Sequence, residues 1–198
     1  MQDKKQHYIP QFYLKNFSII KKLHEDEKPA VFVYDKVEKK LKRKAIKNVG
    51  KENHLYSIRD SDDSLNAIIE KQLSKLEGLF SRILLKIDQS YNNGTFYYEF
   101  DDDDKAIISY FILWQIKRTP RMKEILKQTL LKKIETDENW LKNPDYKALN
   151  NSTIKAMYNA GHTLNIPNYI LNRSWNLFYI SDESINLITS DNLINYRN

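Results

Sequence analysis

The fold class is decided by one stretch of the sequence, residues 65–87, which is LNAIIEKQLSKLEGLFSRILLKI. Its apolar residues recur at intervals of three and four, the period of an amphipathic α-helix. Residues able to cap a helix precede it between Asp60 and Ser64, and residues 92–94 (NNG) provide a stop signal. We therefore predict one long helix that buries a single face.

Strand-forming segments lie on either side of this helical region. Residues 31–34 (VFVY) are β-branched and aromatic, and they predict a strand whose hairpin partner is 39–46. Residues 54–58 alternate between polar and apolar and predict a third strand. Residues 177–180 and 185–189 predict a C-terminal β-hairpin.

Further helices are expected between the first helix and the C-terminal hairpin. The pattern over 103–133 predicts a second long helix, which Pro120 should kink or split. Ser152 can cap a third helix that continues to about Gly161. The acidic run over 101–104 precedes the second helix, and we interpret it as a cap that complements the helix dipole rather than as a metal cluster.

Together these segments predict an α+β fold. A small antiparallel sheet, built from the N-terminal strands and the C-terminal hairpin, should pack against two or three long helices. We expect a single domain over 1–198. It would consist of a basic β-rich part (1–59), a helical part (60–165) and the C-terminal hairpin (170–198).

Composition excludes several classes of protein. The 198 residues contain no cysteine, which excludes a disulfide framework, a thiolate zinc site and a cysteine nucleophile. We find no P-loop, dinucleotide fingerprint, nucleophile elbow or zinc-protease motif. The N-terminus lacks the apolar region of a signal peptide, and no stretch is apolar enough to span a membrane. We therefore expect a cytoplasmic protein without a membrane partner.

The net charge of +6 is concentrated near the N-terminus. Residues 1–59 contain 15 Lys and Arg against 7 Asp and Glu, whereas the remainder is nearly neutral. Such an asymmetry is typical of a face that binds a polyanion, and it makes nucleic acid a candidate partner. A lysine-rich surface that binds nothing charged is the alternative.

The most unusual feature near the N-terminus is residues 7–17, HYIPQFYLKNF. A segment with so many aromatic residues must be packed, because it would otherwise expose a large apolar patch. His7, assisted by Gln11, is a candidate catalytic residue, since imidazole can act as a general base or as a metal ligand near neutral pH. The alternative is that His7 makes structural hydrogen bonds.

Two arginines at the predicted helix break form a second candidate site. Helical spacing can bring Arg118 and Arg121 close to Gln115, and guanidinium groups bind phosphate or carboxylate oxygens bidentately. The alternatives are an ordinary solvated face and a salt bridge to the acidic run.

Carboxylates supply the remaining candidates. Asp191, a catalytic candidate, and Asn192, a substrate-binding candidate, follow the last predicted strand, where Asp191 can bind a metal or orient His7. An ordinary turn is the alternative. Glu70 and Glu77 lie seven residues apart on the first helix; we favour a charged flank over a two-carboxylate metal site, which would need Asp191 nearby. A divalent metal therefore remains a candidate cofactor.

The blocks of the sequence resemble those of an uncharacterised, mainly bacterial family, DUF4238. The resemblance starts with HYIPQFYLKNF (7–17), continues through VYDK (33–36), NVGKE (48–52) and LYS (55–57), and ends with RTP (118–120) and LITSDN (187–192). Family members usually carry proline after the final block and continue further. Leu193 follows here, so the chain resembles a C-terminally shortened member.

The resemblance implies no established reaction, but some family members are associated with bacterial anti-phage defence. We therefore expect an effector that acts on nucleic acid or another phosphate-containing substrate, in the manner of a nuclease. The alternative is a non-catalytic module that binds nucleic acid or protein through the basic N-terminal part.

Overall fold

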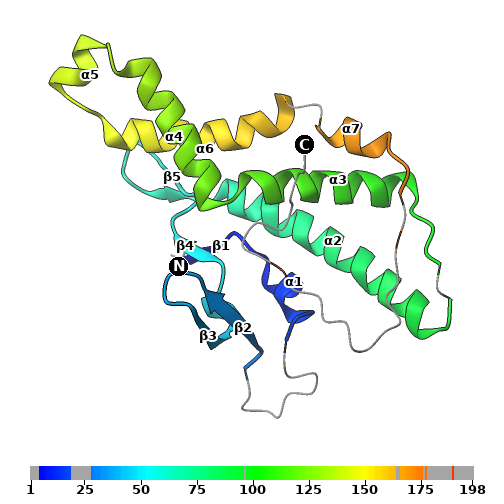
Figure 1. The fold of residues 1–198 in the computed structure, drawn as a ribbon. Coiled ribbons are helices and arrows are strands. Elements are labelled where there is room, and N and C mark those ends of the chain that lie inside the picture. Colours follow the sequence, from blue (N-terminus) through cyan, green and yellow to red (C-terminus); the bar gives the residue numbers. More distant parts are fainter. Residues whose placement is uncertain are drawn as a thin grey trace.

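The computed structural model describes residues 5–18, 28–95, 97–163, 166–175, 177 and 189. It has an α+β fold, as predicted, in which strands near the N-terminus precede a set of packed helices (Figure 1). The strands are β1 (Lys5–His7), β2 (Ala30–Asp35), β3 (Lys40–Ala45), β4 (Lys51–Asn53), β5 (Ile58–Arg59) and β6 (Leu65–Asn66). The helices are α1 (Gln11–Lys15), the 3-10 turn η1 (Ile46–Asn48), α2 (Ile68–Asn92), α3 (Asp102–Lys117), α4 (Pro120–Ile134), α5 (Glu138–Lys142), α6 (Tyr146–Thr163) and α7 (Ile166–Leu171).

The strands form separate antiparallel pairs rather than the single small sheet that we predicted. The described strands pair as β1 with β4, β2 with β3 and β5 with β6. The β2–β3 hairpin confirms the prediction from residues 31–46. The predicted C-terminal hairpin lies outside the described residues apart from Leu177 and Thr189.

The predicted strand over residues 54–58 is wrong for 54–57, whereas Ile58 begins β5. His54 takes a left-handed conformation with φ of 50°, which turns the chain out of the β4 direction. The backbone N–H of Tyr56 then donates to the side chain of Gln6 instead of to a neighbouring strand. Leu55 and Tyr56 are thereby buried in the core, with 0% and 2% of their surface exposed.

The helices follow the predicted pattern, with shifted ends. Pro120 splits the second helical segment into α3 and α4, and the side chain of Thr119 caps α4 by accepting from the N–H of Met122. Asp101 caps α3 by accepting from the N–H of Asp104, which confirms the capping interpretation of the acidic run. The third helix begins at Tyr146, earlier than predicted, because Asp145 rather than Ser152 accepts from its first turn.

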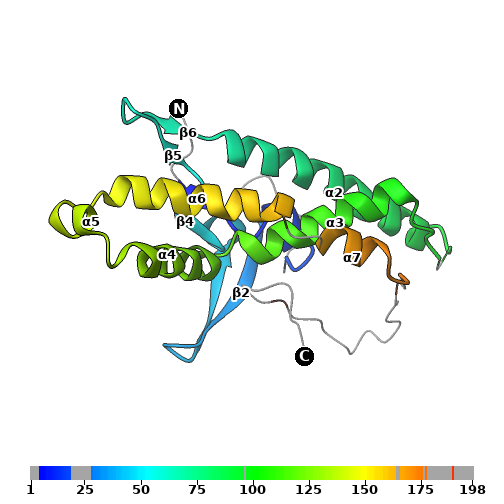
Figure 2. The same ribbon diagram turned by 90° about the horizontal axis from the view of Figure 1, so that it is seen from above.

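Helix α3 occupies the centre of the helical part. Figure 1 shows it between α2 on one side and α6 with α7 on the other, and Figure 2 shows α4 and α6 side by side with α5 at the turn between them. Its buried residues include Ile108 and Phe111 toward one side and Ser109 and Leu113 toward another, so the helix is enclosed on more than one face.

Two apolar clusters meet at the N-terminal segment. The first consists of Leu55, Tyr56, Ile69, Leu73, Ile154 and Met157. The second consists of Ile9, Leu14, Val31 and Ile46 and packs the β2–β3 hairpin against α1. Tyr8 contacts both clusters, so the segment that carries His7 is anchored between them.

Candidate functional site

A cavity of about 370 Å³ opens between β1, α1 and α2, and we call it the site cavity. Its wall is formed by side chains of the N-terminal segment, the chain after β4 and one face of α2. The lining residues are Gln6, His7, Gln11, Phe12, Tyr56, Glu70, Leu73, Ser74, Glu77, Gly78 and Ser81. Two of the predicted catalytic residues, His7 and Gln11, therefore share one cavity.

Helix α2 contributes a polar row to this cavity. Glu70, Ser74, Glu77 and Ser81 follow one another at intervals of four, three and four residues, so they lie on one face of the helix. Our interpretation of Glu70 and Glu77 as a solvated charged flank does not hold, because both carboxylates face the cavity. Seven residues correspond to about 10 Å along the helix axis, so the two glutamates lie at different ends of the row.

Gln6 fixes one end of the cavity. Its carboxamide is 1% exposed and makes three hydrogen bonds: Nε2 donates to Ser57 Oγ at 3.0 Å and to Glu70 Oε2 at 2.8 Å, and Oε1 accepts from the N–H of Tyr56 at 2.7 Å. A buried amide that is fully paired holds its neighbours in one arrangement. Gln6 therefore positions the carboxylate of Glu70 in the cavity that His7 also lines.

Arg118 fixes the other end. Its guanidinium is buried, and Nη1 donates to Glu77 Oε1 at 2.5 Å. In the amide orientation that satisfies both groups, the Gln115 oxygen accepts from Nη2 and Nε of Arg118, the latter at 2.7 Å. The aromatic ring of Phe111 lies 5.9 Å from the guanidinium carbon. Arg118 thus neutralises and orients Glu77.

Tyr56 connects this ion pair to the N-terminal segment. Its hydroxyl donates to the backbone carbonyl of Arg118 at 2.8 Å. Burial raises the pKa of Tyr56 well above its ordinary value, because desolvation penalises the phenolate. The phenol therefore stays protonated and remains a hydrogen-bond donor at the edge of the site cavity.

Nearly the whole chain matches the model of a protein family. The family model described as "Protein of unknown function (DUF4238)" matches residues 5–197. The chain belongs to the DUF4238 family. Comparison with curated proteins and with solved structures finds no match to this chain.

Two of the blocks that resemble DUF4238, HYIPQFYLKNF and LYS, supply residues that line the site cavity, whereas VYDK (33–36) lies in β2 and the turn after it and does not line the cavity. HYIPQFYLKNF forms the end of β1 and α1, and LYS (55–57) supplies Tyr56 and the Ser57 that pairs with Gln6. NVGKE contains Gly50, whose carbonyl accepts from the N–H groups of Tyr8 and Ile9. RTP contains Arg118, which binds Glu77. NVGKE thus contacts the segment 7–17, and RTP contacts a glutamate of the cavity.

The other predicted site residues differ in their surroundings. Arg121 is exposed at the start of α4, whereas Arg118 is buried and paired with Glu77. Phosphate binding by Arg118 stays a prediction and would require its pair with Glu77 to open. Asp191 and Asn192 lie outside the described residues. Thr189 is described, and its hydroxyl lies 3.1 Å from that of Tyr13 on α1.

Sequence reasoning missed Gln6, Ser57 and Ser74. The spacing of Ser74 between Glu70 and Glu77 is a signal for a polar helix face that could have been used. Gln6 and Ser57 carry no such signal, since their importance comes from contacts with residues about 50 positions or more away.

No group of three His, Asp or Glu side chains is placed to hold a metal ion in the part of the chain that the structure describes.

Lys117 is a second group that the sequence did not reveal. It is 4% exposed, and its Nζ has no hydrogen-bond partner among the described residues. Desolvation lowers the pKa of Lys117 from 10.5 to about 8. It lies at the end of α3 but does not line the site cavity.

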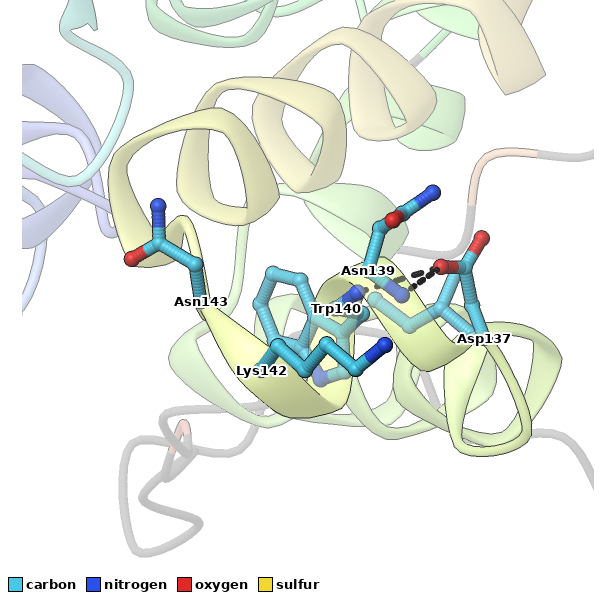
Figure 3. A pocket seen from close by; sticks show the side chains of 6 residues that line it. Asp137, Asn139, Trp140, Lys142 and Asn143 are labelled. Carbon is cyan, nitrogen blue, oxygen red and sulfur yellow. Dashed lines mark hydrogen bonds between the residues drawn. The ribbon is translucent and has the colours of Figure 1, made fainter.

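A second hollow lies at the far end of the molecule, at the turn that contains α5 (Figure 3). It has a volume of about 560 Å³ and is lined by Ile134, Asp137, Asn139, Trp140, Lys142 and Asn143. The carboxylate of Asp137 is engaged in capping, because it accepts from the N–H groups of Asn139 and Trp140. The open shape and the capped carboxylate make this hollow the weaker candidate.

Among the described helices, none combines the length and apolar character needed to cross a membrane.

Proposed function

We propose that this DUF4238 protein is a nuclease-like enzyme that acts on nucleic acid or another phosphate-containing substrate in the site cavity. The observation that carries the proposal is the convergence of His7 and Gln11 with Glu70 and Glu77 in one cavity. A histidine beside carboxylates is a common arrangement for general acid–base hydrolysis. The anti-phage role implied by the family resemblance is part of the proposal, as is a cytoplasmic location, where phage nucleic acid is found.

The charges in the cavity indicate how a phosphate would be bound. Glu77 is neutralised by Arg118, whereas no cation is paired with Glu70 within the described residues. An anionic phosphate therefore needs a counter-ion there. Mg²⁺ is usually held by one or two carboxylates together with oxygens of the substrate phosphate, so Glu70 suits this role.

Asp191 is proposed as the second carboxylate. The support comes from Thr189, which lies two positions earlier in the sequence and contacts Tyr13 on the helix that starts with Gln11. In this scheme His7 accepts the proton of the water that attacks phosphorus, the bond from phosphorus to the leaving ester oxygen breaks, and that oxygen takes a proton from solvent. Gln11 donates a hydrogen bond to a phosphate oxygen.

The proposal is tested by hydrolysis of labelled single-stranded and double-stranded DNA and RNA with and without Mg²⁺. We expect Mg²⁺-dependent cleavage, reduced about 100-fold or more by His7→Asn and by Glu70→Gln. Asp88→Asn is the matched control, because Asp88 is an exposed carboxylate on α2 that does not line the cavity. It should cleave at the wild-type rate.

Thermal unfolding of each variant separates a chemical role from a structural one. Lost cleavage with an unchanged unfolding midpoint would support the site. A His7→Asn variant that cleaves like the wild type would refute it. In cells, the same variant should lose protection against phage at an unchanged protein level.

A non-catalytic nucleic-acid-binding module is the second candidate, and the basic β2–β3 hairpin favours it. The two candidates differ in turnover: a module binds nucleic acid without cleaving it under any metal condition. Binding that is unaffected by His7→Asn, together with no cleavage, would support the module over the enzyme.

A further inference from the structure

The β2–β3 hairpin uses only one of its faces in the core. Val31 is buried and Val33 is partly buried, and both pack in the cluster with Ile9, Leu14 and Ile46. Side chains alternate between the faces of a strand, so Phe32 and Tyr34 point to the opposite side. This outer face remains uncovered by the described part of the chain.

Aromatic and apolar side chains gather on this outer face. The register places Phe32 opposite Arg43 and Tyr34 opposite Leu41, and residues directly opposite each other share a face. Phe32 and Tyr34 are each 57% exposed, and Leu41 is 63% exposed. A contiguous patch of exposed large side chains, unlike a scattered one, indicates a binding surface.

Positive charge lies next to the patch: Arg43 shares its face, and Lys36 and Lys39 are in the adjoining turn, whereas the register places Lys40, Lys42 and Lys44 on the other face. Residues 30–47 contain seven Lys and Arg against two acidic residues. Glu38 is paired with Lys42, and Asp35 accepts from the N–H groups of Val37 and Glu38 in the turn. Within the described residues no ion pair is formed by the cations at positions 36, 39, 40, 43 and 44. The hairpin therefore attracts an anionic partner.

We propose that the outer face of the β2–β3 hairpin binds single-stranded nucleic acid. A phosphate backbone matches Arg43 and the lysines of the adjoining turn, and unpaired bases can stack on Phe32 and Tyr34. A duplex hides the faces of its bases inside the stack, so it cannot use the two rings. A second copy of this chain would bring two basic hairpins together and is disfavoured by charge repulsion. The inference deepens the second candidate function by naming its surface and the form of nucleic acid, and it needs no reaction in the site cavity.

The test is fluorescence anisotropy with a labelled 20-nucleotide oligothymidylate, performed with EDTA so that metal-dependent cleavage cannot occur. Phe32→Ala and Tyr34→Ala should each weaken binding about ten-fold. Tyr97→Ala is the matched control, since Tyr97 is 69% exposed and lies away from the hairpin. It should bind like the wild type.

The dependence on salt tests the charge contribution. Each phosphate contact that is removed lowers the slope of log Kobs against log[salt] by about 0.7 for a single strand. Arg43→Ala should show this change, whereas Lys133→Ala, an exposed lysine on α4, should not.

Four results would overturn the inference. The protein binds a labelled duplex as tightly as the single strand, or Phe32→Ala and Tyr34→Ala both leave the affinity for the oligonucleotide unchanged. Alternatively, the protein does not bind the oligonucleotide even at low salt, or light scattering shows a dimer that Phe32→Ala dissociates. The readout for the hairpin is binding in EDTA, whereas the readout for the site cavity is cleavage with Mg²⁺, so the two proposals fail separately. Circular dichroism confirms that each variant is folded.

Discussion

Gly50 lies where the chain passes from η1 into β4, and we predict that its replacement by alanine is among the most damaging single-atom additions in this protein. Its φ is +62°, a region that residues with a Cβ rarely adopt. A Cβ at this position would lie 2.7 Å from Cβ, 2.8 Å from Cγ1 and 2.9 Å from Cδ1 of Ile9. The carbonyl of Gly50 accepts from the N–H groups of Tyr8 and Ile9 at 2.7 and 3.2 Å, so the two segments cannot separate easily.

The size of the effect follows from two contributions. Holding a residue with a Cβ in the left-handed region costs about 1–2 kcal/mol. Forcing an added methyl group against packed atoms costs about 1–3 kcal/mol more. We therefore expect Gly50→Ala to lower the free energy of unfolding by about 2–5 kcal/mol, a large fraction of the stability of an ordinary domain.

Two other glycines separate the contributions. Gly94 has φ of +78° but open space where a Cβ would lie, so Gly94→Ala should cost only about 1–2 kcal/mol. Gly78 lies within α2 with no atom within 4 Å of an added Cβ, so Gly78→Ala should stabilise by about 0.5–1 kcal/mol. Urea unfolding gives the three values. Equal losses for Gly50→Ala and Gly94→Ala would refute the predicted clash with Ile9.

Three further substitutions test buried polar groups by urea unfolding. Gln6→Leu leaves the N–H of Tyr56 without its acceptor and should cost about 1–3 kcal/mol, whereas no loss would contradict the role of Gln6. Arg118→Met leaves the Glu77 carboxylate unpaired and should cost about 3 kcal/mol, part of which Glu77→Gln in the same chain should restore. Burial lowers the pKa of Lys117 to about 8 in the folded state, so the unfolded chain binds more protons between pH 8 and 10.5 and stability rises with pH in that window. Lys117→Met should therefore stabilise by about 3 kcal/mol at pH 7, and this advantage should vanish above pH 10.5.

Local patterns predicted those parts of the fold that local interactions determine. The period of residues 65–87, the β-branched run at 31–34 and the proline at position 120 correspond to α2, β2 and the break between α3 and α4. The strand predicted over 54–58 failed at 54–57 because Gln6 binds the backbone there, and a contact across 50 residues leaves no trace in the local pattern.

The same reason limited the prediction of the candidate site. His7 and Gln11 stood out because they belong to an aromatic segment that had to be packed. The sequence placed Arg118 at a helix break but not beside Glu77, from which it is separated by 41 residues. Glu70 and Glu77 resembled a solvated flank, since two carboxylates on a helix are usually exposed. The hydrogen bond from Gln6 to Glu70 and the ion pair of Arg118 with Glu77 show why both carboxylates face the site cavity.

The placement of residues 7–17 explains how this site can be held rigidly. Ile9 and Leu14 belong to the cluster beneath the hairpin, whereas Phe12 packs with its ring centroid 6.0 Å from that of Phe80 and 6.1 Å from that of Phe111 in the helical part. His7 and Gln11 lie between residues that are anchored on different sides, so their backbone positions are set by both. At such a junction, substitution of a polar side chain of the site should disturb the fold less than substitution of the packed residues Ile9, Leu14 or Phe12. Loss of activity in His7→Asn at unchanged stability would therefore identify chemistry, whereas a change at Ile9 would disturb anchor and site together.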